Sequence, residues 1–170
     1  PTINSYKRIN APVTASGATW SPNTITYSGN NRTHMIRVPG PGRFELRLMD
    51  GATNPYLLQA GIIASGIDGI EKKRKPGKPV NLNMYEEAHK AKGAKKLPLT
   101  LQQSLSHLNS NKILKSAFGK EVIESYITLK NREIKKYNTS KEKKIGFKGS
   151  KTSNKSNIIT QWEKDNTLDC

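Results

Sequence analysis

Arg43-Phe44-Glu45-Leu46-Arg47-Leu48 alternates charged and apolar side chains. A period of two is typical of a β-strand with one buried face. We expect its apolar side chains to face a core: Phe44, Leu46 and Leu48. Its charged side chains then share the opposite face: Arg43, Glu45 and Arg47. The stretch therefore predicts a strand whose polar face presents one carboxylate between two guanidinium groups.

Two more strands are expected upstream, over residues 24–27 and 34–38, and Pro39-Gly40-Pro41-Gly42 predicts the turn into the strand described above. Arg32 and Arg37 then lie on or beside the neighbouring strand. Arginine binds carboxylate and phosphate oxygens through a planar fork, so this face favours an anionic ligand, or a metal ion with phosphates. The alternative that remains open is an exposed sheet face crossed by ordinary salt bridges.

Helices are expected to follow the strands. Residues 54–70 begin with Asn54 as N-cap and Pro55 at the first helical position, and their apolar side chains cover nearly every face, so we expect this helix to be buried all round. Thr100 and Gln103 form a capping box before an apolar stripe. The further helices are expected over residues 101–108, 111–118 and 120–137, with Gly119 between the last two. The pattern predicts an α+β fold.

Composition limits the possible functions. The chain has 170 residues, 29 basic against 13 acidic, a net charge of +16 and only 34% hydrophobic residues. Such a charge attracts anions, but no aromatic residue interrupts the densest run, residues 72–75, as nucleic-acid modules usually require. A basic nucleic-acid-binding module without enzymatic activity is kept as the alternative function. The longest apolar stretch, residues 56–70, is shorter than the ~20 residues of a membrane span.

Other motifs are weak. The three histidines have no metal-ligand spacing and are interpreted as surface or packing residues: His34, His89 and His107. No phosphate-binding P-loop motif occurs. The single cysteine, Cys170, excludes an internal disulfide. Because the chain starts at Pro1 without a methionine, we interpret it as a piece of a longer protein.

Several strings, in order, resemble the C-terminal part of the glutamine synthetase catalytic domain, and the type III and gamma-glutamylmethylamide synthetase branch in particular. They are Asn4-Ser5-Tyr6-Lys7-Arg8, Asn31-Arg32-Thr33-His34-Met35-Ile36-Arg37-Val38-Pro39, Arg43-Phe44-Glu45-Leu46-Arg47 and Asp50-Gly51-Ala52-Thr53-Asn54-Pro55-Tyr56-Leu57. The resemblance implies antiparallel strands of an active-site sheet followed by C-terminal helices. It also divides the chain into the catalytic part (residues 1–137), a Lys- and Ser-rich insert expected to be disordered (138–158) and a tail with a helical turn around Trp162 (159–170).

The resemblance also implies a reaction. ATP phosphorylates the side-chain carboxylate of glutamate, and ammonia or a primary amine displaces the phosphate to give glutamine or a gamma-glutamylamide. Glu45 matches a carboxylate on a divalent metal ion, Mg²⁺ or Mn²⁺, that bridges the ATP phosphates. Arg8 and Arg47 match glutamate-binding arginines. The arginines that match the surroundings of the ATP phosphates are Arg32, Arg37 and Arg43, and Arg32 is also assigned a catalytic role.

The sequence departs from the family pattern in the flap after Arg8, where Asn10 lies near the position of a glutamate that helps to bind ammonium. Ammonia and methylamine therefore both remain candidate nucleophiles. Tyr85 lies near a tyrosine that some family members adenylylate, and we interpret it as an ordinary loop tyrosine. The family further implies a cytoplasmic, dodecamer-like homo-oligomer with no nucleic-acid or membrane partner. The isolated piece is expected to be inactive.

Overall fold

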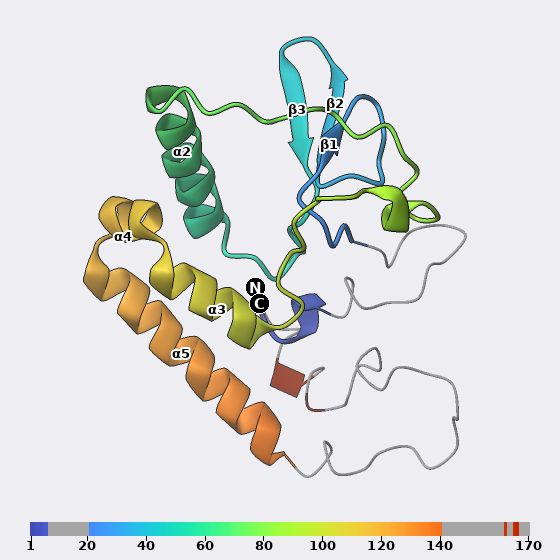
Figure 1. The fold of residues 1–170 in the computed structure, drawn as a ribbon. Helices are drawn as coiled ribbons and strands as arrows, with labels where there is room; N and C mark the ends of the chain where they lie inside the picture. Colours follow the sequence, from blue (N-terminus) through green and yellow to red (C-terminus); the bar gives the residue numbers. More distant parts are fainter. Residues whose placement is uncertain (7–20, 141–161, 163–164, 167–170) are drawn as a thin grey trace, which may run out of the picture.

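The structure is a computed structural model that describes residues 1–6, 21–140, 162 and 165–166. Its strands lie to one side and its longer helices to the other (Figure 1). Within the described part, three strands form one sheet in the order β1 (Tyr27–Ser28), β2 (Ile36–Gly40) and β3 (Arg43–Leu46). The α+β class expected from the sequence is confirmed.

The sheet is smaller than the sequence pattern indicates. β2 and β3 pair antiparallel around the expected turn, but β1 pairs parallel to β2, which the sequence analysis did not anticipate. Thr24 makes only an isolated bridge with Lys96, so the expected strand over residues 24–27 is reduced to its end. The core prediction was wrong for Phe44, whose side chain is 61% exposed. The other two apolar side chains of this alternation, Leu46 and Leu48, are half-buried.

Helix α2 (Pro55–Glu71) begins as expected, since the Asn54 side chain accepts a hydrogen bond of 3.0 Å from the Leu57 N–H. The expectation that it is buried all round was wrong. Asp68 is its one buried residue, and several large apolar side chains are exposed: Tyr56, Ile62, Ile63, Ile67 and Ile70. The reason is that α2 packs mainly against α4, so the described residues leave the sides that carry these five side chains exposed.

Three helices form the rest of the helical layer, and their order agrees with the sequence analysis: α3 (Leu101–Ser110), α4 (Lys112–Phe118) and α5 (Lys120–Thr139). The Thr100 hydroxyl accepts from the Gln103 N–H at 3.2 Å, while the Gln103 side chain accepts from the Leu99 N–H rather than from Thr100. Gly119 separates α4 from α5 at φ 83°, a conformation that favours glycine. α5 extends two residues beyond the expected end.

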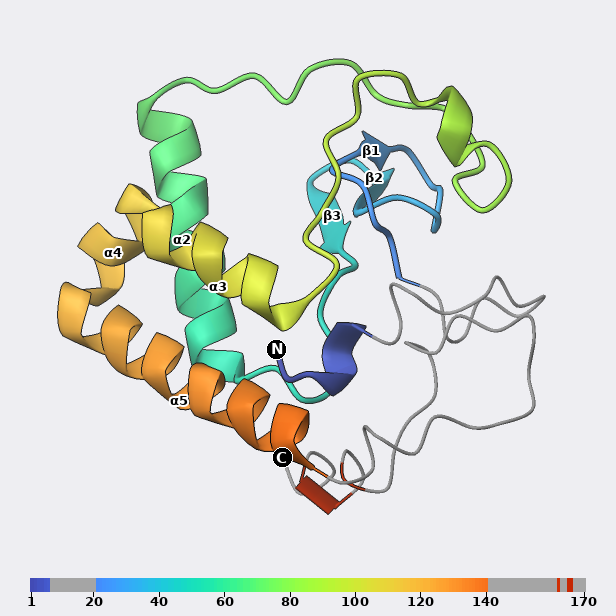
Figure 2. The ribbon, with the colours of Figure 1, turned by 60° about the horizontal axis from the view of Figure 1, so that its bottom comes forward.

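The core lies where the N-terminal segment meets these helices. The short 3₁₀ helix η1 (Asn4–Tyr6) packs Tyr6 against Leu101 and Leu105 of α3, and its start lies beside α5 (Figure 2). The Tyr6 hydroxyl donates to the Ser104 hydroxyl. The Ile3 N–H donates to a carboxylate oxygen of Glu133 in α5 at 3.0 Å. Segments more than 90 residues apart in the sequence therefore build one core.

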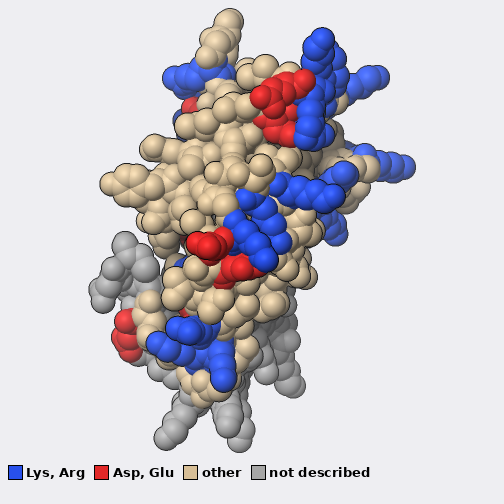
Figure 3. All heavy atoms as spheres, turned by 90° about the vertical axis from the view of Figure 1, so that its left-hand side faces the viewer, with Lys and Arg blue, Asp and Glu red and all other residues tan. Residues whose placement is uncertain are grey.

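The positive charge is spread over several groups of side chains. On the face that carries α2 and α4, Lys and Arg side chains lie in separate clusters, several with acidic side chains beside them, next to a broad area without charged residues (Figure 3). Residues 72–75 are exposed, and two of them, Lys72 and Arg74, form ion pairs with the buried Asp68 carboxylate. These contacts hold the pKa of the Asp68 carboxyl below its ordinary value. Within the described residues, no helix has the length and apolar character needed to cross a membrane.

Two segments predicted from the sequence, the insert (138–158) and the tail (159–170), lie only partly within the described residues. Of the expected insert, residues 138–140 end α5 as helix and cap, and residues 141–158 are not described. In the expected tail, Trp162 is helical and its ring contacts that of Tyr137 edge-on, at 5.3 Å between centroids.

Tyr126 should make the protein less stable in alkali. Burial raises the pKa of its hydroxyl from 10.0 to about 12. The folded state thus keeps the proton where the unfolded state loses it, so the free energy of unfolding should fall as the pH rises from 10 to about 12. Tyr126→Phe should reduce this fall, measured as urea midpoints across that pH range. Tyr56→Phe, at a side chain 82% exposed, is the control and should leave the fall unchanged.

Candidate active site

A carboxylate held by arginines lies on the β2–β3 ribbon. Arg37 and Glu45 are direct partners in the antiparallel register, so their side chains project from the same face. Nη1 of Arg37 donates to both carboxylate oxygens of Glu45, at 2.8 and 2.7 Å. The predicted neighbourhood of Glu45 and Arg37 is confirmed by these contacts.

Two further arginines come from β3 and the residue that follows it. Nη2 of Arg43 donates to Oε1 of Glu45 at 3.1 Å, and Nη1 of Arg47 lies 3.9 Å from Oε2. The Arg37 hydrogen bonds, with the charges of all three guanidinium groups, hold the pKa of the Glu45 carboxyl below its ordinary value. The carboxylate stays ionised, and the cluster as a whole keeps an excess of positive charge.

Arg47 has an unused donor. Its Nε is buried and finds no acceptor among the described residues. A buried guanidinium N–H without an acceptor is costly, so such a group calls for an acceptor supplied from elsewhere. Carboxylate and phosphate oxygens are acceptors of the kind that an arginine N–H binds.

Arg32 does not join the cluster. It lies exposed in the loop between β1 and β2, and the ion pairs of Glu45 with described residues come from the other three arginines. Arg8 and Asn10 lie outside the described residues. Tyr85 is half-buried in a loop, where its N–H donates to Asn83.

Asn30 is a site residue that sequence reasoning missed. Its side-chain oxygen accepts from Nε of Arg37 at 2.9 Å and also from Nη2. Arg37 is therefore held from two sides, by the β1–β2 loop and by Glu45. The sequence around Asn30 signals only a turn, because the contact depends on the parallel pairing of β1 with β2.

The described residues supply part of a metal site. They contain no group of three or more His, Cys, Asp or Glu side chains that could hold a metal ion. Glu45 can offer one ligand, since a carboxylate has about four lone-pair positions and the donors within hydrogen-bonding distance use three. The donor set fits one carboxylate of a shared site, and the other ligands must come from outside the described residues.

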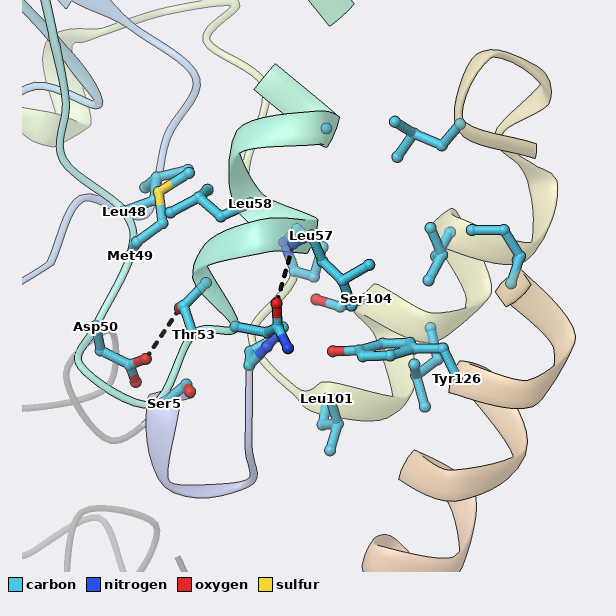
Figure 4. A pocket seen from close by; sticks show the side chains of 18 of the residues that line it. Ser5, Leu48, Met49, Asp50, Thr53, Leu57, Leu58, Leu101, Ser104 and Tyr126 are labelled. Atoms are coloured by element: carbon cyan, nitrogen blue, oxygen red, sulfur yellow. Dashed lines mark hydrogen bonds between the residues drawn. The ribbon is translucent and has the colours of Figure 1, made fainter. Parts of the chain in front are cut away.

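An apolar cavity of about 400 Å³ lies apart from this cluster, between α2, α3 and α5. Leu57 and Leu58 line it from α2, Leu101 from α3 and Tyr126 from α5 (Figure 4). Asp50 is its acidic residue, and it accepts a hydrogen bond from the Thr53 hydroxyl at 3.2 Å. With so few polar groups, the cavity belongs to the packing of the helical layer rather than to the arginine cluster.

Residues 1–145 match the family model of the glutamine synthetase catalytic domain. The chain is 52% identical over 169 residues to a glutamine synthetase of Rhizobium leguminosarum bv. phaseoli, covering 99% of this chain and 35% of the relative. It is 44% identical over 140 residues to the glutamate–methylamine ligase of Methyloversatilis universalis, covering 81% of this chain and 31% of the relative.

A solved structure of a GmaS/ADP complex is similar over 100% of this chain and 35% of its own, with 46% sequence identity and a TM-score of 0.76. The chain thus spans about a third of the length of the proteins that it matches. The match to the family model, which includes every residue of the arginine cluster, shows that this chain belongs to the family of the glutamine synthetase catalytic domain.

Proposed function

We propose that this chain is the C-terminal part of an ATP-dependent ligase that joins glutamate to ammonia or to a primary amine. The observation that carries the proposal is the Glu45 carboxylate, held by Arg37 and surrounded by Arg43 and Arg47. The cluster has more guanidinium groups than carboxylates, so a bound anion would neutralise its remaining positive charge. The phosphates of ATP and the carboxylates of glutamate are such anions.

The reaction proceeds in two balanced steps. The terminal phosphoryl group of ATP passes to the side-chain carboxylate of glutamate, and ADP leaves. The amine nitrogen then attacks the acyl carbon, the C–O bond to phosphate breaks, and the nitrogen loses a proton to give the amide. Phosphoryl transfer needs mainly positioning and neutralisation of charge, which arginines supply.

Each arginine has a proposed role. Arg37 and Arg43 hold ATP phosphates at the open side of the Glu45 carboxylate, and Arg47 directs its unused Nε toward glutamate. Arg32 reaches the phosphates from the β1–β2 loop, and Arg8 binds glutamate. Glu45 supplies one ligand to a divalent cation, Mg²⁺ or Mn²⁺, which when bound neutralises phosphate charge. The remaining ligands come from other parts of the full-length protein.

The similarity to both a glutamine synthetase and a glutamate–methylamine ligase supports an amide-forming ligase and leaves both nucleophiles as candidates. Neither the family model nor these relatives support the alternative of a nucleic-acid-binding module. The homo-oligomer and the cytoplasmic location stay predictions.

The test is an assay of the full-length protein with ATP, glutamate and either ammonia or methylamine. We expect one ADP, one phosphate and one gamma-glutamylamide per turnover, with the better nucleophile identified by competition between the two amines. The isolated 170-residue chain should form no amide, because Glu45 is the one carboxylate that the described residues place in the cluster. ATP turnover without an amide product would contradict the proposed reaction, and robust synthesis by the isolated chain would contradict the expected need for upstream residues.

A further inference from the structure

His34 is completely buried, with 0% of its surface exposed, and both ring nitrogens have partners. Nε2 lies 3.0 Å from the carbonyl oxygen of Leu82, which can only accept, so Nε2 carries the proton and donates. Nδ1 lies 2.9 Å from the Thr26 hydroxyl, which then donates to it. The surroundings thus select one neutral tautomer.

The same carbonyl is held by a second residue of the β1–β2 loop (residues 29–35). The Asn31 side-chain amide donates to the Leu82 carbonyl at 2.9 Å. The Thr33 hydroxyl accepts from the N–H of the buried Met84 at 2.9 Å and donates to Asn31 at 2.8 Å. We call these contacts, from Asn31, Thr33 and His34 to Leu82 and Met84, the loop clamp.

The loop clamp acts on the segment that carries two groups of the proposed site. Arg32 lies between Asn31 and Thr33, so clamp residues flank it directly in the sequence. Asn30 precedes them and supports Arg37, which in turn binds Glu45. Three side chains of this loop therefore hydrogen-bond to the backbone of Leu82 and Met84. These contacts lie next in sequence to the residues that we propose to bind ATP.

We propose that His34 is a positioning residue for the amide-forming reaction: by donating to the Leu82 carbonyl it fixes the β1–β2 loop, and with it Arg32 and Asn30, in the geometry that binds ATP. The inference rests on the proposed function. It extends that function to a residue that touches no substrate and that the sequence indicates only as a surface or packing histidine.

Three variants of the full-length protein separate this role from simple packing. His34→Gln can keep an N–H donor near the Nε2 position, His34→Asn keeps a polar group only near the Nδ1 position, and His34→Ala removes both. We expect the KM for ATP to rise about tenfold in His34→Asn and His34→Ala, and to stay within about threefold of wild type in His34→Gln. The KM for glutamate should change less.

A histidine that serves only packing gives a different result. All three variants would then lose thermal stability, while the folded fraction kept the wild-type KM for ATP. Equal KM values in His34→Gln and His34→Asn, or a wild-type KM in His34→Ala, would overturn the proposal. Asn109→Ala, at an exposed residue of α3, is a control that should leave both KM values unchanged.

Hydrogen exchange provides a readout that does not depend on the reaction. Peptides that cover residues 29–35 and 81–85 should lose protection in His34→Asn and His34→Ala, and keep it in His34→Gln. If the wild-type enzyme forms no amide, the proposed function fails, and the loop clamp is then judged by this exchange pattern alone. Unchanged protection in all three variants would refute the clamp even in an active enzyme.

Discussion

Glu45→Gln should lower kcat/KM of the full-length protein by about 10²–10³-fold, the loss typical when one group that stabilises charge in a transition state is removed. The amide is close in size to the carboxylate but carries no charge. Arg37 and Arg43 then lose their anionic partner, and the proposed cation loses one ligand. The requirement for Mg²⁺ should shift to higher concentrations, measured as activity against Mg²⁺ at saturating ATP.

The matched control for this substitution is Glu86→Gln. Glu86 is an exposed glutamate in a loop, outside the arginine cluster. It loses the same charge and should keep wild-type activity. Wild-type kcat/KM and an unchanged Mg²⁺ requirement in Glu45→Gln would show that the carboxylate only forms an ion pair with Arg37 between β2 and β3 and has no role in the reaction.

Leu105→Ala should lower the free energy of unfolding by about 2–5 kcal/mol, the range for a large apolar side chain truncated in a core. Leu105 is 3% exposed and packs with Tyr6 and Leu101. It also borders the apolar cavity, so the truncation enlarges a space that already exists. We expect the loss to be toward the upper end of the range, because the cost grows with the volume left empty.

Leu129→Ala is the control for the core truncation. The leucine of α5 is 61% exposed, so the same change in size should alter the free energy of unfolding by no more than about 0.5 kcal/mol. Both variants are compared with the wild type by their urea midpoints. Similar losses in the two would mean that the Tyr6–Leu101–Leu105 cluster is not the core of this part of the protein.

The local elements could be predicted from the sequence because their signals are local. Asn54, Thr100 and Gly119 mark helix ends through caps and a glycine conformation, and the structure confirms all three. The alternation of residues 43–48 correctly placed Glu45 on the charged face beside Arg37. The family could be recognised because several ordered motifs agree.

Long-range features could not be predicted in the same way. The burial of Phe44 and of the apolar sides of α2 depends on which other segments pack against them. An apolar pattern in the sequence indicates a face suited to burial, but it does not identify the segment that covers it. The parallel pairing of β1, the support of Arg37 by Asn30 and the burial of His34 all depend on how the β1–β2 loop returns along the sheet. None of these has a periodic signal.

The contacts of η1 have a consequence for the order of folding. Ile3 binds Glu133, 130 residues further along the chain, and Tyr6 binds Ser104, 98 residues further along, so both partners are synthesised much later. During synthesis on the ribosome, Ile3 and Tyr6 therefore lack their packing partners in α3 and α5 while the sheet and α2 are already synthesised. Because contacts of such separation slow folding, assembly of this core is expected to be a late step, and a chain that stops before α5 is exposed to misfolding.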